Sequence, residues 1–533
     1  MVRPSFWTSL TLSLILLGAL PVAAQQDWKV YEFFNLTGGL NNAADPTALK
    51  PSEASDLQNV VFDTSGGIAK RNGFARVNAS AACGGDVFTG LFMYRQADGD
   101  RFLVGLCAND TVVKMDYAGG TTGPDGTWDD ITGSLSFAID QDDLADFATV
   151  QNVLVFTDGL GTNDPYTYSG TGDAALLTAA PNASMVEFHN RILWVAGRSD
   201  ARSRLDFSNL DDYTTWTSTD FILVETDDGQ VITGLKSALD CLYVFKTESI
   251  HRVCGRDRDN LRLEQMVRGI GAASNNSITL INNKFIFLTN LGDIAVYDGG
   301  INVQILSSKI EGTLGGLNLN RLQYASAVAF DDGTGDQDYY LSVSTSGSGT
   351  HDRVLVYDTY HQAWTKFAGI AANAITDYEV GTQQKAVLFG NYTGFANRYP
   401  SGTSDAGSSI EAFYQSGHLR LDIPTVKTFR DVQLFIRQEG SYSITFEQRV
   451  DFAATGTATS VSLAGTGALW DTAIWDAASY GDITTAILIV PVQTDGDFFQ
   501  WRIQDTSTNN PFLLRGLRLW AEPVGRLGGK SAI

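Results

Sequence analysis

The sequence predicts an all-β protein: a β-propeller of six or seven blades followed by a C-terminal β-sandwich of the jelly-roll type. The composition favours strands joined by tight turns, because the 533 residues include 53 glycines, only 12 prolines and 11% aromatic residues. No long window has the helical spacing of apolar residues. A hairpin-like pattern also recurs roughly every 40 to 55 residues, which is the spacing of propeller blades.

Seven stretches share one form, namely a short apolar run, a polar turn and a second apolar run, which is typical of a β-hairpin. They are residues 101–117, 152–168, 190–207, 241–253, 284–297, 338–357 and 385–399. A single four-stranded blade cannot bury both of its faces, so a ring of blades over residues 80–405 is the expected arrangement. An irregular stack of β-sandwiches is the alternative. The blade number stays open, because residues 59–74 could supply a strand that closes the ring.

The N-terminal residues 1–24 resemble a cleavable secretory signal. Arg3 gives a positive start, residues 6–20 an apolar core, and residues 22–24 are small. The segment is too short for a comfortable membrane span, so we expect no stable one. An uncleaved anchor and a wrongly assigned start are the alternatives.

Residues 25–79 are expected to form an arm with a short helix and a hairpin. Pro51 is predicted to open the helix, whose first turn carries Glu53 and Asp56 at the end that favours acids. The hairpin pairs residues 59–62 with 68–74 around a glycine turn.

The chain changes character after the loop 400–409, and residues 406–525 are predicted to form the sandwich, with a flexible tail at 526–533. Val432, Leu434 and Ile436 alternate with polar residues, as in a strand with one wet face. The expected strands are 412–416, 427–437, 442–450, 460–463, 486–492, 498–503 and 512–520. Trp470 and Trp475 lie in a loop between strands and are interpreted as core plugs rather than as sugar-stacking platforms.

Four cysteines lack the spacing of a metal site. Cys241 and Cys254 lie on the two strands of one predicted hairpin, and Cys83 and Cys107 are placed to bridge neighbouring strands. In an exported protein they would form two disulfides, whereas in a reducing compartment they would be small buried hydrophobic residues.

The sequence contains no recognisable catalytic, cofactor-binding or metal-binding motif, so we predict a protein that is not an enzyme and needs no cofactor. The five histidines lack zinc-site spacing, and His351 is expected in an exposed loop. Residues 269–274 imitate a dinucleotide fingerprint without the required βαβ unit. The acidic runs 140–146 and 331–338 could bind calcium, but they lack EF-hand spacing and are interpreted as solvated loops.

The opening of the chain resembles a known protein family. Its elements are Gly38-Gly39-Leu40-Asn41, Asp45-Pro46, a Glu-Ala pair leading to Leu-x-Asn-Val at 57–60, and an Arg-x-Gly-Phe ending at Phe74. The likeness continues at 207–209, 229–235, 244–250, 268–271, 292–299, 354–364 and 388–395. These motifs are similar to those of the tail nozzle, tail tubular protein B or head-stabilisation (tail hub) propellers of short-tailed phages.

This resemblance implies a structural virion protein. It would form a ring, usually of six copies, that contacts the portal, the adaptor and other tail proteins, and DNA would pass through it only as cargo. The net charge of −23 and the lack of basic patches exclude a sequence-reading DNA binder, and an acidic conduit would repel phosphate. The signal-like N-terminus departs from this pattern, since phage tails are built in the cytoplasm. The alternative is therefore a secreted or periplasmic propeller that binds a glycan or a protein.

Overall fold

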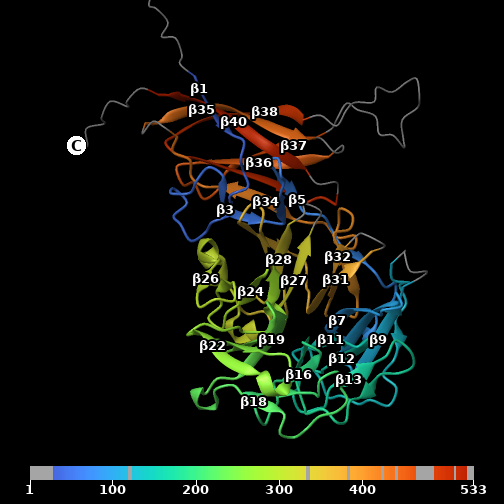
Figure 1. Cartoon of the computed structure of the whole chain (residues 1–533). Coiled ribbons are helices and arrows are strands. Elements are labelled where there is room, and N and C mark those ends of the chain that lie inside the picture. The colour runs from blue at the N-terminus through green and yellow to red at the C-terminus, as the bar shows by residue number, and fades with distance from the viewer. Residues whose placement is uncertain are drawn as a thin grey trace, which may run out of the picture.

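The computed structural model describes residues 28–117, 123–331, 336–380, 385–421, 425–437, 442–463, 485–508 and 512–524. The signal-like segment 1–24, Trp470, Trp475 and the tail 526–533 lie outside these residues. The described chain consists almost entirely of strands, arranged as a ring of small sheets beneath a pair of larger sheets (Figure 1). No helix in the described part is long and apolar enough to cross a membrane.

Seven four-stranded antiparallel sheets form the blades of a β-propeller in the described residues. Blade 1 contains β7 (Phe88–Arg95), β8 (Arg101–Cys107), β9 (Thr111–Asp116) and β10 (Asp129–Asp130), and blade 2 contains β11 (Phe147–Val150), β12 (Val153–Phe156), β13 (Tyr166–Tyr168) and β14 (Ala175–Leu176). Blade 3 contains β15 (Met185–His189), β16 (Ile192–Ala196), β17 (Arg204–Phe207) and β18 (Phe221–Leu223), and blade 4 contains β19 (Ile232–Ala238), β20 (Cys241–Lys246), β21 (Ser249–Cys254) and β22 (Arg262–Arg268). Blade 5 contains β23 (Thr279–Ile281), β24 (Lys284–Leu288), β25 (Ile294–Tyr297) and β26 (Val303–Ile305), and blade 6 contains β27 (Ser326–Asp331), β28 (Gln337–Val343), β29 (Arg353–Asp358) and β30 (Ala363–Ala368). Blade 7 combines β31 (Ala374–Glu379), β32 (Lys385–Gly390) and β33 (Ala396–Tyr399) with the early strand β6 (Ala75–Arg76). The seven predicted hairpins are the second and third strands of these blades, so the predicted propeller is confirmed.

The ring closes in two ways. The innermost strands contact one another around the axis until β31 meets β7, with the 3₁₀ helix η5 (Asn275–Ser277) next to β19 ahead of β23. In addition, β6 pairs with β33, so that the start and the end of the propeller share one blade. Residues 59–74, which could have supplied a closing strand, lie just before the strand β6 that does so. Their hairpin, β4 (Val60–Phe62) with β5 (Ile68–Lys70), belongs to another sheet because β5 pairs with β40 (Leu513–Pro523).

The second strand of each blade explains why the hairpins are visible in the sequence. In β20, Leu242 and Val244 pack into the cluster shared with blade 3, whereas Tyr243 and Phe245 pack into the cluster shared with blade 5. Because successive side chains point to opposite faces, a strand buried on both faces must be a continuous apolar run. The propeller core is thus a set of hydrophobic layers between neighbouring blades.

Two six-stranded sheets form the second part of the molecule. One contains β1 (Lys29–Phe33), β4, β5, β35 (Lys427–Arg437), β38 (Thr485–Gly496) and β40; the other contains β2 (Gly39–Leu40), β3 (Glu53–Gln58), β34 (Ala412–Ser416), β36 (Ser443–Val450), β37 (Thr457–Ser462) and β39 (Phe499–Asp505). Side chains from both sheets share one hydrophobic cluster, and the rings of Phe429 and Phe499 lie 4.9 Å apart across it. We call this pair of sheets the two-sheet domain.

Two expectations about the N-terminal region are wrong. Residues 25–79 do not form a separate arm, since β1 to β5 are strands of the two-sheet domain. The helix expected after Pro51 is instead β3, whose Ala54 and Leu57 are fully buried and which pairs with β34. A sheet edge from the distant C-terminal region therefore overrides the local helix signal.

Arg71 fastens the two-sheet domain to the propeller. Its guanidinium donates to Asn59 Oδ1 at 2.8 Å, to the Ala368 carbonyl at 2.9 Å, and to both oxygens of Asp405 at 2.8 and 2.7 Å. Next to it, Lys70 pairs with Asp505 at 2.9 Å, and both of these side chains are 1% exposed. The Lys70–Asp505 pair lies within the two-sheet domain, between β5 and β39, so we call only the contacts of Arg71 the joint.

The glycine of the Arg-x-Gly-Phe motif is required by a close backbone approach. A Cβ on Gly73 would lie 2.0 Å from the carbonyl oxygen of Ser404. We expect Gly73→Ala to displace the segment 401–404 and to lower the free energy of unfolding by about 1–3 kcal/mol. Urea unfolding measures this change. Gly349→Ala is the matched control, because its Cβ would meet nothing within 4 Å, and an equal loss in both variants would contradict the packing explanation.

Candidate ligand site on the propeller axis

Two polar hollows lie on the propeller axis. The first, of about 270 Å³, is bordered by the segments that lead into the inner strands of blades 2 to 6, and we call it the mouth. The second, of about 170 Å³, lies deeper, among the inner strands themselves. Asp146 and Asn276 line both hollows, so the two are neighbours at these residues.

Asp146 and Asn275 occupy the mouth because each also ties its blade to the next. Asp146, just before β11, accepts a hydrogen bond from the Val186 backbone N–H at 2.9 Å with its Oδ2. Asn275 opens the short 3₁₀ helix η5 (Asn275–Ser277) before β23, and its Oδ1 accepts from the Leu235 N–H at 3.0 Å. The two side chains are 8% and 9% exposed, so the ring holds both rigidly.

Negative charge on the axis is only partly compensated. Burial raises the pKa of Asp146, although Lys236 and the Val186 N–H oppose this shift. Burial also raises the pKa of Asp143, and the neighbouring carboxylates of Asp140, Asp158 and Asp142 add to the effect. Raised carboxyl pKa values grouped in a hollow are typical of functional sites, because such groups cost stability where they are.

Glu187 on β15 is a third carboxyl with a raised pKa, and it interacts with Asp146 and Lys236. Its pKa is raised to about 7, mainly by burial and also by the Asp146 carboxylate, while Lys236 opposes the shift. The folded protein therefore binds more protons than the unfolded chain between pH 4.5 and about 7, and the stability linked to Glu187 falls as pH rises through this window.

We expect Glu187→Gln to be more stable than the parent at pH 8, by about 1–2 kcal/mol, and to show a flatter pH profile between pH 4.5 and 7. Urea unfolding at a series of pH values measures this. Glu248, which is exposed in a turn, supplies the control variant Glu248→Gln. A loss of stability in Glu187→Gln at pH 8 would contradict the assignment.

The mouth also contains a donor without an acceptor. Asn275 Nδ2 is buried and has no hydrogen-bond partner. The amide lies near the Asp146 carboxyl and favours its charged form, but it closes no hydrogen bond with it. At the rim, Arg321 donates to both oxygens of Asp142 at 3.0 and 2.5 Å, while its Nε has no acceptor. Buried donors of this kind are uncommon in folded proteins, so a ligand that supplies an acceptor would be stabilised here.

The acidic run 140–146 is not the solvated loop that the sequence suggested. Asp142, Asp143 and Asp146 line the mouth, and Asp146 is buried. The expectation for His351 is also wrong, since it is fully buried, shares a 2.8 Å hydrogen bond through Nδ1 with the Ala372 carbonyl, and burial lowers its pKa to about 4. The described residues contain no cluster of His, Cys, Asp or Glu that could hold a metal ion.

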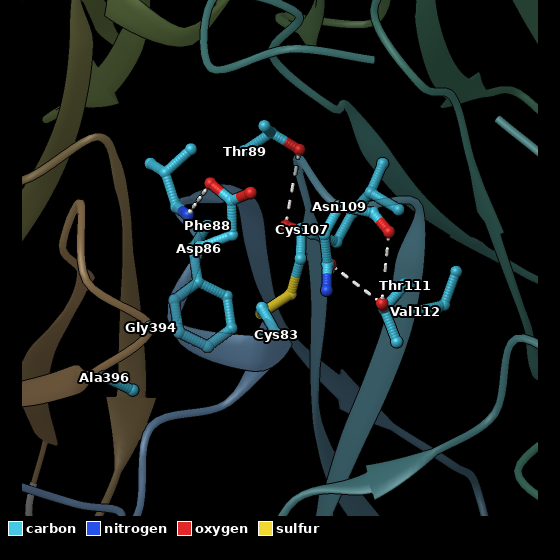
Figure 2. Close-up of a disulfide and its surroundings, with 12 residues drawn as sticks. Cys83, Asp86, Phe88, Thr89, Cys107, Asn109, Thr111, Val112, Gly394 and Ala396 are labelled. Atoms are coloured by element: carbon cyan, nitrogen blue, oxygen red, sulfur yellow. Dashed lines mark hydrogen bonds between the residues drawn. A yellow bond between two sulfur atoms is a disulfide. The ribbon is translucent and has the colours of Figure 1, made fainter. Parts of the chain in front are cut away.

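The four cysteines are paired as two disulfides, Cys83 with Cys107 and Cys241 with Cys254. The second pair joins directly opposed residues of β20 and β21. Figure 2 shows the first pair, which joins the turn before β7 to the end of β8, with Gly394 and Ala396 of blade 7 close by. Of the two alternatives left open by the sequence, the structure has the disulfides.

Comparisons with known proteins give only general likenesses. No family model matches the chain, and no curated protein matches it. The similar solved structures include the Neurospora crassa Pan2 WD40 domain (7% identity, TM-score 0.38, covering 64% of this chain and 98% of that one). YCF48 bound to D1 peptide is similar at 12% identity and a TM-score of 0.38, covering 65% of this chain and 98% of that one. BBS1N in complex with ARL6DN is similar at 10% identity and a TM-score of 0.40, covering 63% of this chain and 99% of that one. The propeller assignment rests on the closed ring of seven sheets.

Proposed function

We propose that the chain is an exported, non-enzymatic β-propeller that binds a polar ligand at the mouth. The observation that carries this proposal is the pairing of all four cysteines, because structural disulfides persist in oxidising compartments and are rare in the cytoplasm. The signal-like residues 1–24 support the same location independently. The mouth supports binding, since it presents carboxylates and an unpaired amide donor on a rigid ring.

The location can be tested with the full chain expressed in a bacterium that has a periplasm. We expect the mature protein to begin near Gln25, to be found outside the cytoplasm, and to react with maleimide at four cysteines only after reduction. Intact-mass measurement of the non-cytoplasmic protein, with and without reductant, gives the position of the N-terminus and the number of cysteines that react with maleimide. An uncleaved chain in the cytoplasm with four reactive thiols would contradict the proposal.

The second candidate is a structural protein of a phage tail. The observation that favours it is the resemblance of residues 38–74, which fold into β2 to β5 and the joint and are thus central to the architecture. The chain would then assemble into a ring with other copies and contact portal, adaptor and other tail proteins, and its acidity would let DNA pass without sticking. Finding the chain by mass spectrometry only in purified virions would establish this candidate over the first.

A further inference from the structure

We propose that the mouth binds one neutral sugar ring of a glycan, whose hydroxyl groups donate to Asp146 and Asp143 and accept from Asn275 Nδ2. This inference rests on the proposed binding function and adds the class of ligand.

The hydrogen-bonding groups require a ligand that both donates and accepts. Asp146 accepts from the Val186 N–H through Oδ2, and an ionised carboxylate has further acceptor sites. Asn275 needs an acceptor, since its Nδ2 has no partner and its other amide atom is occupied by Leu235. A hydroxyl group does both, and two neighbouring hydroxyls on a sugar ring can satisfy an adjacent carboxylate and amide together.

The other ligand classes leave part of the mouth unsatisfied. A simple cation would pair with the acids but would leave the Asn275 donor buried without a partner, and it would meet the charge of Lys236 in the deeper hollow. An anion would accept from Asn275 but would be repelled by Asp143 and Asp146. An apolar ligand would remove water from the carboxylates without offering them hydrogen bonds, because most residues that line the mouth are polar.

The size and position of the mouth suit a single ring. Its volume of about 270 Å³ lies just below the roughly 300–1,000 Å³ of sites for drug-sized ligands, so the mouth has room for one sugar ring rather than a buried oligosaccharide. Tyr324 and Gln323, on the 3₁₀ segment η7 (Leu319–Tyr324), form part of the rim. The Arg321 guanidinium lies over one face of the half-buried Tyr324 ring, 4.8 Å from its centroid, so that face is not open to a sugar, and the rest of the glycan would extend into solvent.

The deciding variant is Asn275→Asp. It keeps an oxygen for the Leu235 N–H and replaces only the unpaired donor with an acceptor. We expect binding of neutral sugars to weaken at least tenfold in Asn275→Asp, whereas a cationic ligand would bind more tightly. Asn320→Asp is the matched control, because it places the same charge on an exposed position of η7 and should leave binding unchanged.

The probes are a panel of neutral hexoses, 6-deoxyhexoses and N-acetylhexosamines. Saturation-transfer NMR with the residue 25–533 protein measures their binding, and a glycan array tests longer chains. Asp146→Asn, which keeps an acceptor for the Val186 N–H, should also lose at least tenfold in affinity and covers the case in which Asn275→Asp does not fold. No binding to any member at millimolar concentration, or binding that neither variant changes, would overturn the sugar assignment. The test of export is independent of this result, so a protein that is exported and disulfide-bonded would still support the proposed function.

Discussion

Replacing Arg71 with methionine should lower the free energy of unfolding by about 3–5 kcal/mol, because it removes one partner of a buried ion pair. Arg71 is 1% exposed and makes five hydrogen bonds, so its loss leaves Asp405 charged and buried beside unpaired acceptors. Since these contacts join the two parts of the molecule, we expect the two-sheet domain and blades 6 and 7 to become more susceptible to protease as well. Urea unfolding and limited proteolysis measure the two effects.

The control and the rescue for this prediction are both available in the chain. Arg252→Met removes an exposed pair with Glu264 at 2.7 Å and should cost less than about 1 kcal/mol. The double variant Arg71→Met with Asp405→Leu removes both charges of the joint and should recover much of the lost stability. A single Arg71→Met variant as stable as the control would show that the joint does not hold the domains together.

Removing the disulfides should have the second large effect. The bonds close loops with sequence separations of 24 and 13 residues, and loops of this size gain about 3 kcal/mol each from restricting the unfolded chain. We therefore expect each paired replacement, Cys83→Ala with Cys107→Ala or Cys241→Ala with Cys254→Ala, to lose about 2–4 kcal/mol.

Equilibrium unfolding with and without a phosphine reductant measures this loss directly. The reductant should destabilise the parent chain and have no effect on a variant that lacks all four cysteines, which serves as the control. If the parent has the same stability with and without reductant, the bonds do not form in solution, and the main support for export disappears.

The propeller was predictable because its middle strands are buried on both faces. Runs such as those of β20 and β24 are apolar whichever way a side chain points, so they stand out in the sequence without any knowledge of their neighbours. The outermost strands give no such signal, since β10 is two exposed aspartates and β14 is an exposed Ala-Leu pair. The blade count could therefore be settled only by the hydrogen-bonded ladders.

The two-sheet domain was only half predictable. Its C-terminal strands alternate clearly, and β34 and β35 have the expected bounds. The hairpin of β4 and β5 was predicted, but β1 and β3 were missed because their partners lie far away in the sequence, as for Ala54 opposite Ser416. Local signals at Pro51 and Glu53 favoured a helix, and long-range pairing decided otherwise.

The mouth was not predictable from the sequence. Asp146 and Asn275 are ordinary polar residues that happen to precede the inner strands of blades 2 and 5, and only closure of the ring brings them together. One usable signal existed, since the polar residues Asp146, Ser184 and Asn275, just ahead of the first strands of blades 2, 3 and 5, all line the mouth. The acidic run 140–146 carried that signal, but without the ring it could not be distinguished from a solvated loop.

The most direct test of an exported binding module against a tail ring is the assembly state of residues 25–533. We would measure the mass by light scattering and image the same sample by electron microscopy, under oxidising conditions. We expect a monodisperse monomer, because the seven blades close within one chain and the mouth is complete without a second copy. A closed ring of several copies around a central hole would contradict it and would establish the tail-conduit reading in its place.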